Sequence, residues 1–125
     1  MKKPTLRTDR IAELLRQEIA NLVLLEVKDP RVEGVNITGV TISKDLSVAN
    51  VRWLVYAPEE EVERRRERAQ AGLDTVTSFL RREVGKRIRM RITPQLKFHW
   101  DSGIEHRRHM DDLLAEIAGQ REGES

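Results

Sequence analysis

Cysteine is absent from this sequence of 125 residues, and aromatic residues make up only 4% of it. Without cysteine there is no disulfide framework, no thiol nucleophile and no thiolate metal site, which fits a reducing compartment. The scarcity of aromatic rings leaves few platforms on which unpaired nucleic-acid bases could stack. The composition therefore disfavours disulfide-rich secreted proteins, thiol enzymes and proteins that read single strands by stacking.

Long apolar runs are also absent. No run approaches the roughly 18 residues that a membrane-spanning helix needs, and the segment from Met1 to Arg7 lacks the apolar centre of a signal peptide. A chain of this length can bury roughly two thirds of its unfolded surface in one domain. We expect a soluble, cytoplasmic protein without membrane contact, with one domain over residues 1–118 and a flexible tail over residues 119–125.

Apolar periodicity indicates the elements of the first half of the chain. Helical spacing predicts a first helix from about Thr8 to Glu26, which Asp29-Pro30 ends because a residue before proline is pushed out of helical geometry. Alternating apolar residues then predict a two-stranded hairpin that turns at Lys44-Asp45-Leu46-Ser47. The alternation changes phase across Gly39, which predicts a β-bulge there.

The second half of the chain is predicted to be mainly helical. A helix should begin at Pro58, and the following run of Glu complements its positive N-terminal end. Ala71-Gly72 is a plausible break, so we expect two helices that meet near residues 71–78. A third strand from Gln95 to Trp100 and a last helix from about Ile104 to Ala118 follow.

The order helix, strand, strand, helix, helix, strand, helix predicts an α+β fold. It matches a single KH-like (type II K-homology) domain, in which helices pack on one face of a three-stranded sheet. An ordinary KH domain carries a Gly-x-x-Gly loop between its paired helices, and this loop clamps a nucleic-acid backbone. Glycine here occupies positions 34, 39, 72, 85, 103, 119 and 123, and no pair has that spacing. The usual grip on single strands is therefore missing.

Positive charge is concentrated in one segment, although the formal net charge is only +2. Residues 81–99 contain seven Lys or Arg and one acid, whereas residues 100–125 contain three Lys or Arg and seven acids. If residues 73–89 are helical, the apolar residues share one face and Arg82, Lys86 and Arg89 share the opposite one. This outward stripe predicts a polyanionic partner.

Ordinary solvated surface is the alternative for any charged helix face. The near absence of acids favours binding for residues 81–91. Between Glu59 and Arg68 the balance is reversed, because acids and bases interleave at helix-pairing distances. That segment is interpreted as a solvated, self-paired helix.

Histidine offers the one hint of metal binding or catalysis. His106 and His109 stand one turn apart with His99 nearby, but a convergent third ligand and an ordered second shell are not evident. Asp101 and Ser102 are interpreted as helix caps rather than members of a hydrolytic triad. We predict no metal site, no cofactor, no small-molecule substrate and no enzymatic activity.

Five segments together resemble the ribosome-binding factor A family, in the same order and at compatible spacing over roughly residues 7–117. They are Val27-Lys28-Asp29-Pro30-Arg31, Ser43-Lys44-Asp45-Leu46-Ser47, Phe79-Leu80-Arg81 leading to Gly85-Lys86-Arg87-Ile88-Arg89-Met90-Arg91, Pro94-Gln95-Leu96-Lys97-Phe98, and Ile104-Glu105 to Met110-Asp111-Asp112-Leu113-Leu114.

This resemblance implies a KH-like bacterial protein that binds the maturing 30S ribosomal subunit and its 16S rRNA. Such proteins assist late maturation and rRNA processing, support growth in the cold, and are not enzymes. The family's helix-kink-helix has an Ala-x-Gly signature where this chain has Val76-Thr77-Ser78, so the kink is also open to placement at Ala71-Gly72. The family's Asp-x-Ser-Ile-Glu reads Asp101-Ser102-Gly103-Ile104-Glu105 here.

The predicted RNA contacts are the basic residues of the 81–91 segment with two weaker candidates on loops: Arg81, Arg82, Lys86, Arg87, Arg89, Arg91, Arg31 and Lys44. Neutralised phosphates would release counterions, so binding should weaken steeply with salt. We expect a monomer that recognises folded RNA. The alternatives are a general KH-type RNA- or DNA-binding module, and a protein-interaction domain whose acidic ends dock a basic partner.

Overall fold

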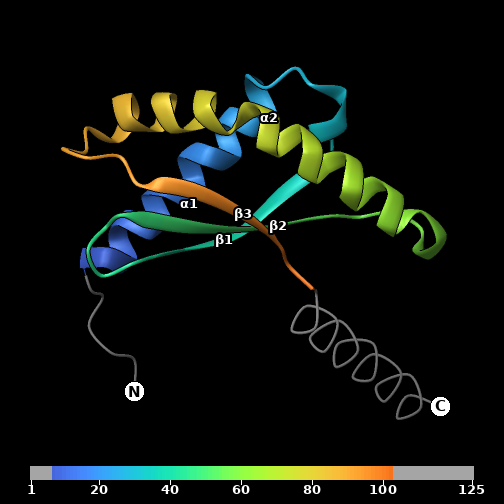
Figure 1. Ribbon diagram of the computed structural model, residues 1–125, viewed down its shortest axis with the longest axis horizontal. Coiled ribbons are helices and arrows are strands. Elements are labelled where there is room, and N and C mark those ends of the chain that lie inside the picture. The colour runs from blue at the N-terminus through green and yellow to red at the C-terminus, as the bar shows by residue number, and fades with distance from the viewer. Residues whose placement is uncertain (1–6, 103–125) are drawn as a thin grey trace, which may run out of the picture.

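A computed structural model describes residues 7–102 of the chain, in which two long helices cover one face of a three-stranded sheet (Figure 1). The elements in order are α1 (Arg7–Leu25), the short 3₁₀ helix η1 (Pro30–Val32), β1 (Val35–Ile42), β2 (Val48–Val55), the 3₁₀ helix η2 (Glu59–Glu61), α2 (Val62–Ile88) and β3 (Gln95–Trp100). The predicted α+β class is confirmed. The last predicted helix and the predicted tail lie outside the described residues.

Helix α1 forms where the apolar spacing predicts it, within one residue at each end. Its buried side chains recur three or four positions apart and face the sheet: Ala12, Leu15, Ile19, Leu22 and Val23. The chain then turns into η1, whose first residue is Pro30 and whose N-cap is Asp29. Asp29-Pro30 thus separates two elements.

The sheet has the order β1-β2-β3, with β1 antiparallel to β2 and β3 parallel to β2. The predicted bulge is confirmed: the register of β1 and β2 shifts between Ile37 and Gly39, so Thr38 has no partner in the ladder. The Thr38 hydroxyl donates to Asp101 just after β3, at 2.7 Å. A Cβ at Gly39 would lie 2.4 Å from the Arg52 guanidinium, so glycine makes room for that side chain.

The prediction of two helices between residues 58 and 89 was wrong. After the turn η2, α2 continues unbroken through Gly72, and Figure 1 shows it bending near its middle. Gly72 is buried, and a Cβ there would lie 2.7 Å from Val32 Cγ2. Glycine at this position therefore serves close packing on η1 and does not end the helix.

Two threonine hydroxyls accompany the bend in α2. Thr75 Oγ1 donates to the carbonyl of Ala71 at 3.0 Å, and Thr77 Oγ1 donates to the carbonyl of Leu73 at 2.7 Å. Hydroxyl groups that bond to the carbonyl four residues earlier often bend helices. The bend therefore falls in the region predicted for the junction, without an interruption of the helix.

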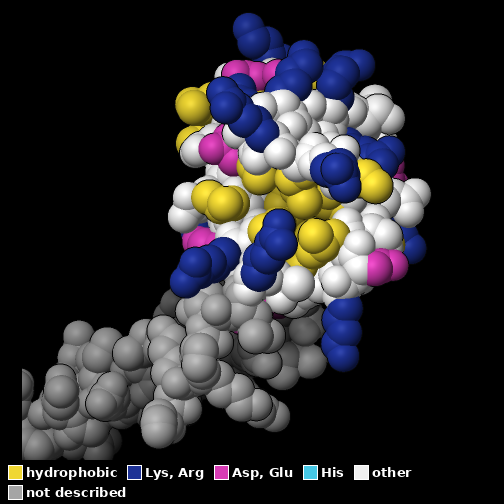
Figure 2. Space-filling view, turned by 90° about the vertical axis from the view of Figure 1, so that its left-hand side faces the viewer, with side chains coloured by type: hydrophobic (Ala, Val, Ile, Leu, Met, Phe, Trp, Pro, Cys, Tyr) yellow, Lys and Arg dark blue, Asp and Glu magenta, His cyan; other side chains and the backbone are white. Residues whose placement is uncertain are grey.

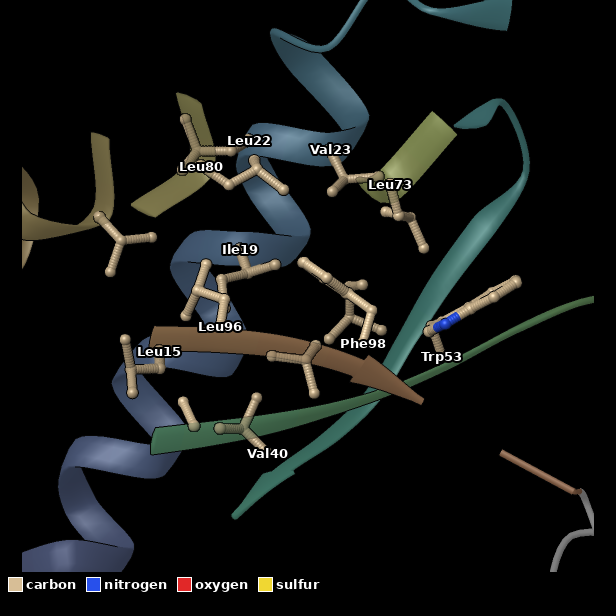
Figure 3. Close-up of a cluster of buried hydrophobic side chains, with 14 of the residues drawn as sticks. Leu15, Ile19, Leu22, Val23, Val40, Trp53, Leu73, Leu80, Leu96 and Phe98 are labelled. Atoms are coloured by element: carbon tan, nitrogen blue, oxygen red, sulfur yellow. The ribbon is translucent and has the colours of Figure 1, made fainter. Parts of the chain in front are cut away.

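The core lies between the sheet and the two helices (Figure 3). Trp53 of β2 is fully buried, and its ring meets Trp100 edge-on with ring centroids 5.1 Å apart. Leu73, Leu80 and Val84 of α2 are also fully buried, as the predicted apolar stripe requires. Each such aliphatic side chain contributes about 1.5–3 kcal/mol through burial. The core therefore fixes which face of α2 points to solvent.

No helix within residues 7–102 has the length and apolar character needed to cross a membrane.

Candidate nucleic-acid interface

The end of α2, the loop after it and the β1–β2 turn lie at one end of the molecule (Figure 1). Helix α2 stops at Arg89, which takes the left-handed conformation with φ 56° and donates its backbone N–H to the carbonyl of Gly85. The chain then reaches β3, where Gln95 N donates to the carbonyl of Ser47 in the turn. This contact ties the loop to the turn.

Arg81 holds the loop against the helix. Its Nη2 donates to the carbonyl of Thr93 at 2.9 Å, and its Nε donates to the carbonyl of Pro94 at 3.2 Å. Since two of its donors serve the backbone, this predicted RNA contact also has a structural role. It positions the segment that carries Arg89 and Arg91.

Arg82, Lys86 and Arg89, here called the basic stripe, all point to solvent as predicted. The Lys86 ammonium lies 3.2 Å from Glu83, but its side chain is 68% exposed and the contact is weak. Arg82 and Arg89 make no side-chain hydrogen bond or ion pair with another residue of the described range 7–102. The stripe therefore presents positive charge that the protein itself neutralises little.

Arg87 faces a different neighbour. Its guanidinium lies 2.8 Å from Glu26 and 3.6 Å from Glu18, the first just after α1 and the second within it. Two carboxylates compensate the charge of Arg87. Its main role is therefore to link α2 to α1, and it adds little positive charge to the basic stripe. Helical periodicity of α2 alone does not reveal a partner on another helix.

Arg91 and Ile92 are exposed in the loop after α2, and Ile92 has 70% of its surface accessible. Figure 2 shows this end of the molecule, where Lys and Arg side chains surround an apolar patch. Positive charge gathered at one end of the molecule favours a polyanionic partner.

Lys44 lies in the β1–β2 turn, which hydroxyl groups make rigid. Asp45 Oδ1 accepts hydrogen bonds from the hydroxyls of Ser47 at 2.7 Å and Ser43 at 2.8 Å. These bonds, the one from Ser47 first, lower the pKa of Asp45 to about 2. Leu46 completes the turn with φ 63°. Lys44 is thus placed on an ordered support.

Arg31 lies away from this end, beside the bend of α2. Its guanidinium forms a two-point pair with Asp29, with Nη2 2.6 Å from Oδ2, and the same Nη2 donates to Thr75 Oγ1 at 3.3 Å. The hydrogen bonds from Arg31 lower the pKa of Asp29 to about 2. The eight predicted contacts therefore do not form one surface.

Three further arginines, which the sequence prediction treated as self-paired surface, surround Arg31. Arg64, Arg65 and Arg68 of α2 line one cleft with it. Two expected pairs do form, Arg64 with Glu61 at 3.5 Å and Arg66 with Glu63 at 3.4 Å. The missed signal was the spacing of 64, 65 and 68, which places three cations on one side of a helix.

Metal ligands do not gather in residues 7–102: no three His, Asp or Glu side chains there are close enough to hold an ion. His99 Nε2 lies 2.8 Å from Asn50 Oδ1 on the sheet. His106 and His109 lie outside the described residues.

The sequence is similar to proteins of known family. A family model described as ribosome-binding factor A matches residues 7–114. Ribosome-binding factor A from Moorella thermoacetica is 44% identical over 115 residues, which cover 90% of this chain and 91% of that protein.

Solved structures show the same likeness. The crystal structure of ribosome-binding factor A from Thermus thermophilus matches with a TM-score of 0.62 and 26% identity, over 75% of this chain and 96% of that one. A Thermus thermophilus ribosome-binding factor A homology model fitted into a cryo-EM map of its complex with the 30S subunit matches with a TM-score of 0.55 and 28% identity, over 70% and 87% of the two chains.

Proposed function

Because the chain belongs to the ribosome-binding factor A family, we propose that it binds the 30S ribosomal subunit and its 16S rRNA as a non-catalytic assembly factor. It acts as a monomer in the bacterial cytoplasm and assists late maturation and processing of the rRNA. The complex of the Thermus relative with the 30S subunit supports the choice of partner.

The exposed basic stripe is the observation that carries this proposal. The side chains of Arg82 and Arg89 have no internal partner within residues 7–102, so RNA phosphates would meet positive charge that the protein does not compensate. Each phosphate that Arg or Lys neutralises releases counterions, which adds affinity and makes it salt-dependent. The helix under the stripe is anchored by Leu80 and Val84, so the cations are presented on a rigid element.

Recognition of folded RNA fits better than recognition of single strands. Trp53 and Phe98 are buried, and Phe79 and Trp100 are partly buried against the core. Stacking of unpaired bases would therefore have to rely on Tyr56, which is exposed. With continuous α2 in place of a Gly-x-x-Gly loop, phosphate contacts at fixed spacing remain the main means of recognition.

The predicted residues have two kinds of role in this proposal. Arg82, Lys86, Arg89 and Arg91 contact phosphates directly, with Lys44 at the flank. Arg81 positions the loop that carries Arg91, and Arg87 positions α2 on α1.

Co-sedimentation with purified 30S subunits tests the proposal. The variant Arg82→Glu/Arg89→Glu should bind at least about 10-fold more weakly at 0.1 M salt, and its log affinity should fall less steeply with log salt, by about 2 units of slope. The matched control is Lys28→Glu/Lys97→Glu, which changes net charge equally at two exposed residues without partners in the described range.

The proposal fails if the wild-type protein sediments with subunits no better than a neutral control protein. If both double variants lose binding equally, the basic stripe is not the surface that contacts the subunit. Comparable affinity for unstructured RNA and for subunits would favour the general KH-type module instead.

A further inference from the structure

A second group of arginines lies where the first half of α2 meets η1. Arg31, Arg64, Arg65 and Arg68 line an open cleft of about 360 Å³ between α2 and η1, together with Pro30 and Glu33. We propose that this arginine cleft binds a backbone phosphate of RNA. The inference rests on the proposed function and adds to it a second rRNA contact, separate from the basic stripe.

Arg65 is held in place by the backbone that it crosses. Its Nη2 donates to the carbonyl of Glu33 at 3.3 Å. The next residue, Gly34, has φ +83°, and a Cβ there would lie 3.0 Å from the same Nη2. Glycine therefore permits both the left-handed turn and the close approach of the guanidinium. The half-buried Arg65 side chain loses little further freedom when it binds a ligand.

Arg31, which η1 contributes to the cleft, is also ordered. Asp29 accepts hydrogen bonds from its backbone N–H at 2.9 Å and from its Nε at 3.0 Å, and Thr75 accepts one from its Nη2. Nη1 of Arg31 makes no hydrogen bond with any residue in the described part of the chain. A fixed guanidinium with unused donors is suited to a phosphate oxygen.

Arg64 and Arg68 supply mobile charge above these two fixed groups. They stand four residues apart, so they share one face of α2. Arg64 is 72% exposed and its contact with Glu61 is long, at 3.5 Å. Arg68 is exposed and has no side-chain hydrogen bond or ion pair within residues 7–102. Both side chains can turn toward a ligand in the cleft.

The charge and lining of the cleft favour a phosphate over an acidic peptide. Four guanidinium groups face three nearby carboxylates, those of Asp29, Glu33 and Glu61, so the cleft is net positive. Pro30 is its one apolar lining residue, whereas peptide docking relies on buried apolar anchors. Planar guanidinium groups match the tetrahedral oxygens of phosphate at two points.

The cleft and the stripe lie on different halves of α2. Arg64 and Arg82 are 18 positions apart, which corresponds to roughly 27 Å along a straight helix. Phosphates at both places would belong to separate segments of a folded RNA. Two phosphate sites at a fixed spacing would select RNA by its shape, without reading its sequence.

A single charge reversal tests the cleft. Arg68→Glu should weaken binding to 30S subunits by about 5- to 10-fold at 0.1 M salt, the contribution of one phosphate contact. The matched control Lys97→Glu makes the same charge change at an exposed strand residue without a partner in the described range, and it should bind like the wild type. Equal binding by the two variants would overturn the cleft and leave the proposed function intact.

A second measurement decides the matter even if subunits do not bind. The Nε–H signals of Arg31 and Arg65 are followed by NMR while a short double-stranded RNA is added at low salt. We expect these signals to shift in the wild-type protein and to shift less in Arg68→Glu. If they remain unmoved while amide signals near Arg82 shift, the cleft does not bind RNA phosphate.

Discussion

The two halves of α2 both carry several cations, but they hold them in different ways. In the first half, Arg65 is bound to the Glu33 carbonyl, and Arg66 lies over the ring of Trp100, 5.4 Å from its centroid. In the second half, Arg82 and Arg89 extend into solvent without side-chain partners in the described range. The first half therefore holds the Arg65 guanidinium in a cleft, beside the more exposed Arg64 and Arg68, and the second presents a stripe whose cations are largely uncompensated.

In the proposed function, this difference separates two contributions to RNA binding. Free surface cations contribute long-range attraction that is screened by salt. Guanidinium groups fixed by hydrogen bonds contribute geometry, because their donors are already aligned before a phosphate arrives. A protein that has both can approach RNA quickly and still require a particular spacing of phosphates.

Replacing one glycine in each half of α2 by alanine tests how closely that half is packed. We expect the largest effect on the free energy of unfolding from this comparison. Gly72→Ala places a Cβ against Val32 and Arg31 at 2.7 and 3.0 Å, whereas Gly85→Ala meets the rotatable hydroxyl of Thr93. Overpacking costs about 1–3 kcal/mol, while each alanine gains about 1 kcal/mol of helix propensity. We expect Gly72→Ala to be less stable than Gly85→Ala by about 1–3 kcal/mol.

Urea unfolding of the two variants, followed by circular dichroism, measures this difference in the free energy of unfolding. Each variant is the control for the other, since both make the same change inside one helix. Equal stabilities would show that η1 can move away from α2.

The Arg87 pair tests the anchoring of the second half. A double-mutant cycle with Arg87→Ala and Glu26→Gln should give a coupling energy of about 0.5 kcal/mol, typical of a partly exposed pair. The same cycle on Lys86 and Glu83 should give a smaller coupling energy, because the Lys86 side chain is more exposed than that of Arg87. Thermal unfolding of the four proteins in each cycle supplies these values.

Arg87→Ala also distinguishes an anchoring role from a phosphate contact. Because the carboxylates of Glu18 and Glu26 compensate its charge, the salt dependence of subunit binding should match that of the wild type. If the slope of log affinity against log salt falls by about 1 unit in this variant, Arg87 contacts a phosphate.

The smallest effect concerns Asp29, which orders Arg31 in the first half. Its pKa falls from 3.8 to about 2 through the hydrogen bonds from Arg31, so the native state holds its carboxylate charged. A depressed native pKa stabilises the fold above pH 3.8, and this contribution is lost as pH falls toward 2. Wild type should therefore exceed Asp29→Asn in stability at neutral pH, and the gap should close as pH falls from about 4 to about 2.

Urea unfolding of both proteins at several pH values checks the trend. If the difference in stability between wild type and Asp29→Asn stays constant down to the lowest pH of that range, the Asp29 carboxylate does not stabilise the fold through its charge.

Much of this fold followed from local pattern. The limits of α1 and β3 and the bulge near Gly39 were predicted correctly, because each depends on periodicity or phase within a few residues. The outward direction of the basic stripe was predicted for the same reason. Once Leu80 and Val84 are buried, helical geometry determines where Arg82 and Lys86 point.

Contacts between distant segments were beyond that kind of prediction. Gly72 is interpreted as a helix break from propensity, but its role comes from Val32, which lies forty positions earlier in the chain. Arg87 belongs to a charged cluster in sequence, yet its partners stand on α1 and just after it. The arginine cleft exists because η1 brings Arg31 beside Arg65.

The sequence by itself determined the class of fold, the resemblance to a family of ribosome-binding proteins and the basic face of α2, since spacing along one chain specifies all three. Only the tertiary structure decided which cations remain free. Arg87 and Arg65 have partners from other segments, while the side chains of Arg82 and Arg89 have none among residues 7–102. The physical reason is that neutralisation of a charge depends on distance in space, which the packing of η1, α1 and α2 sets.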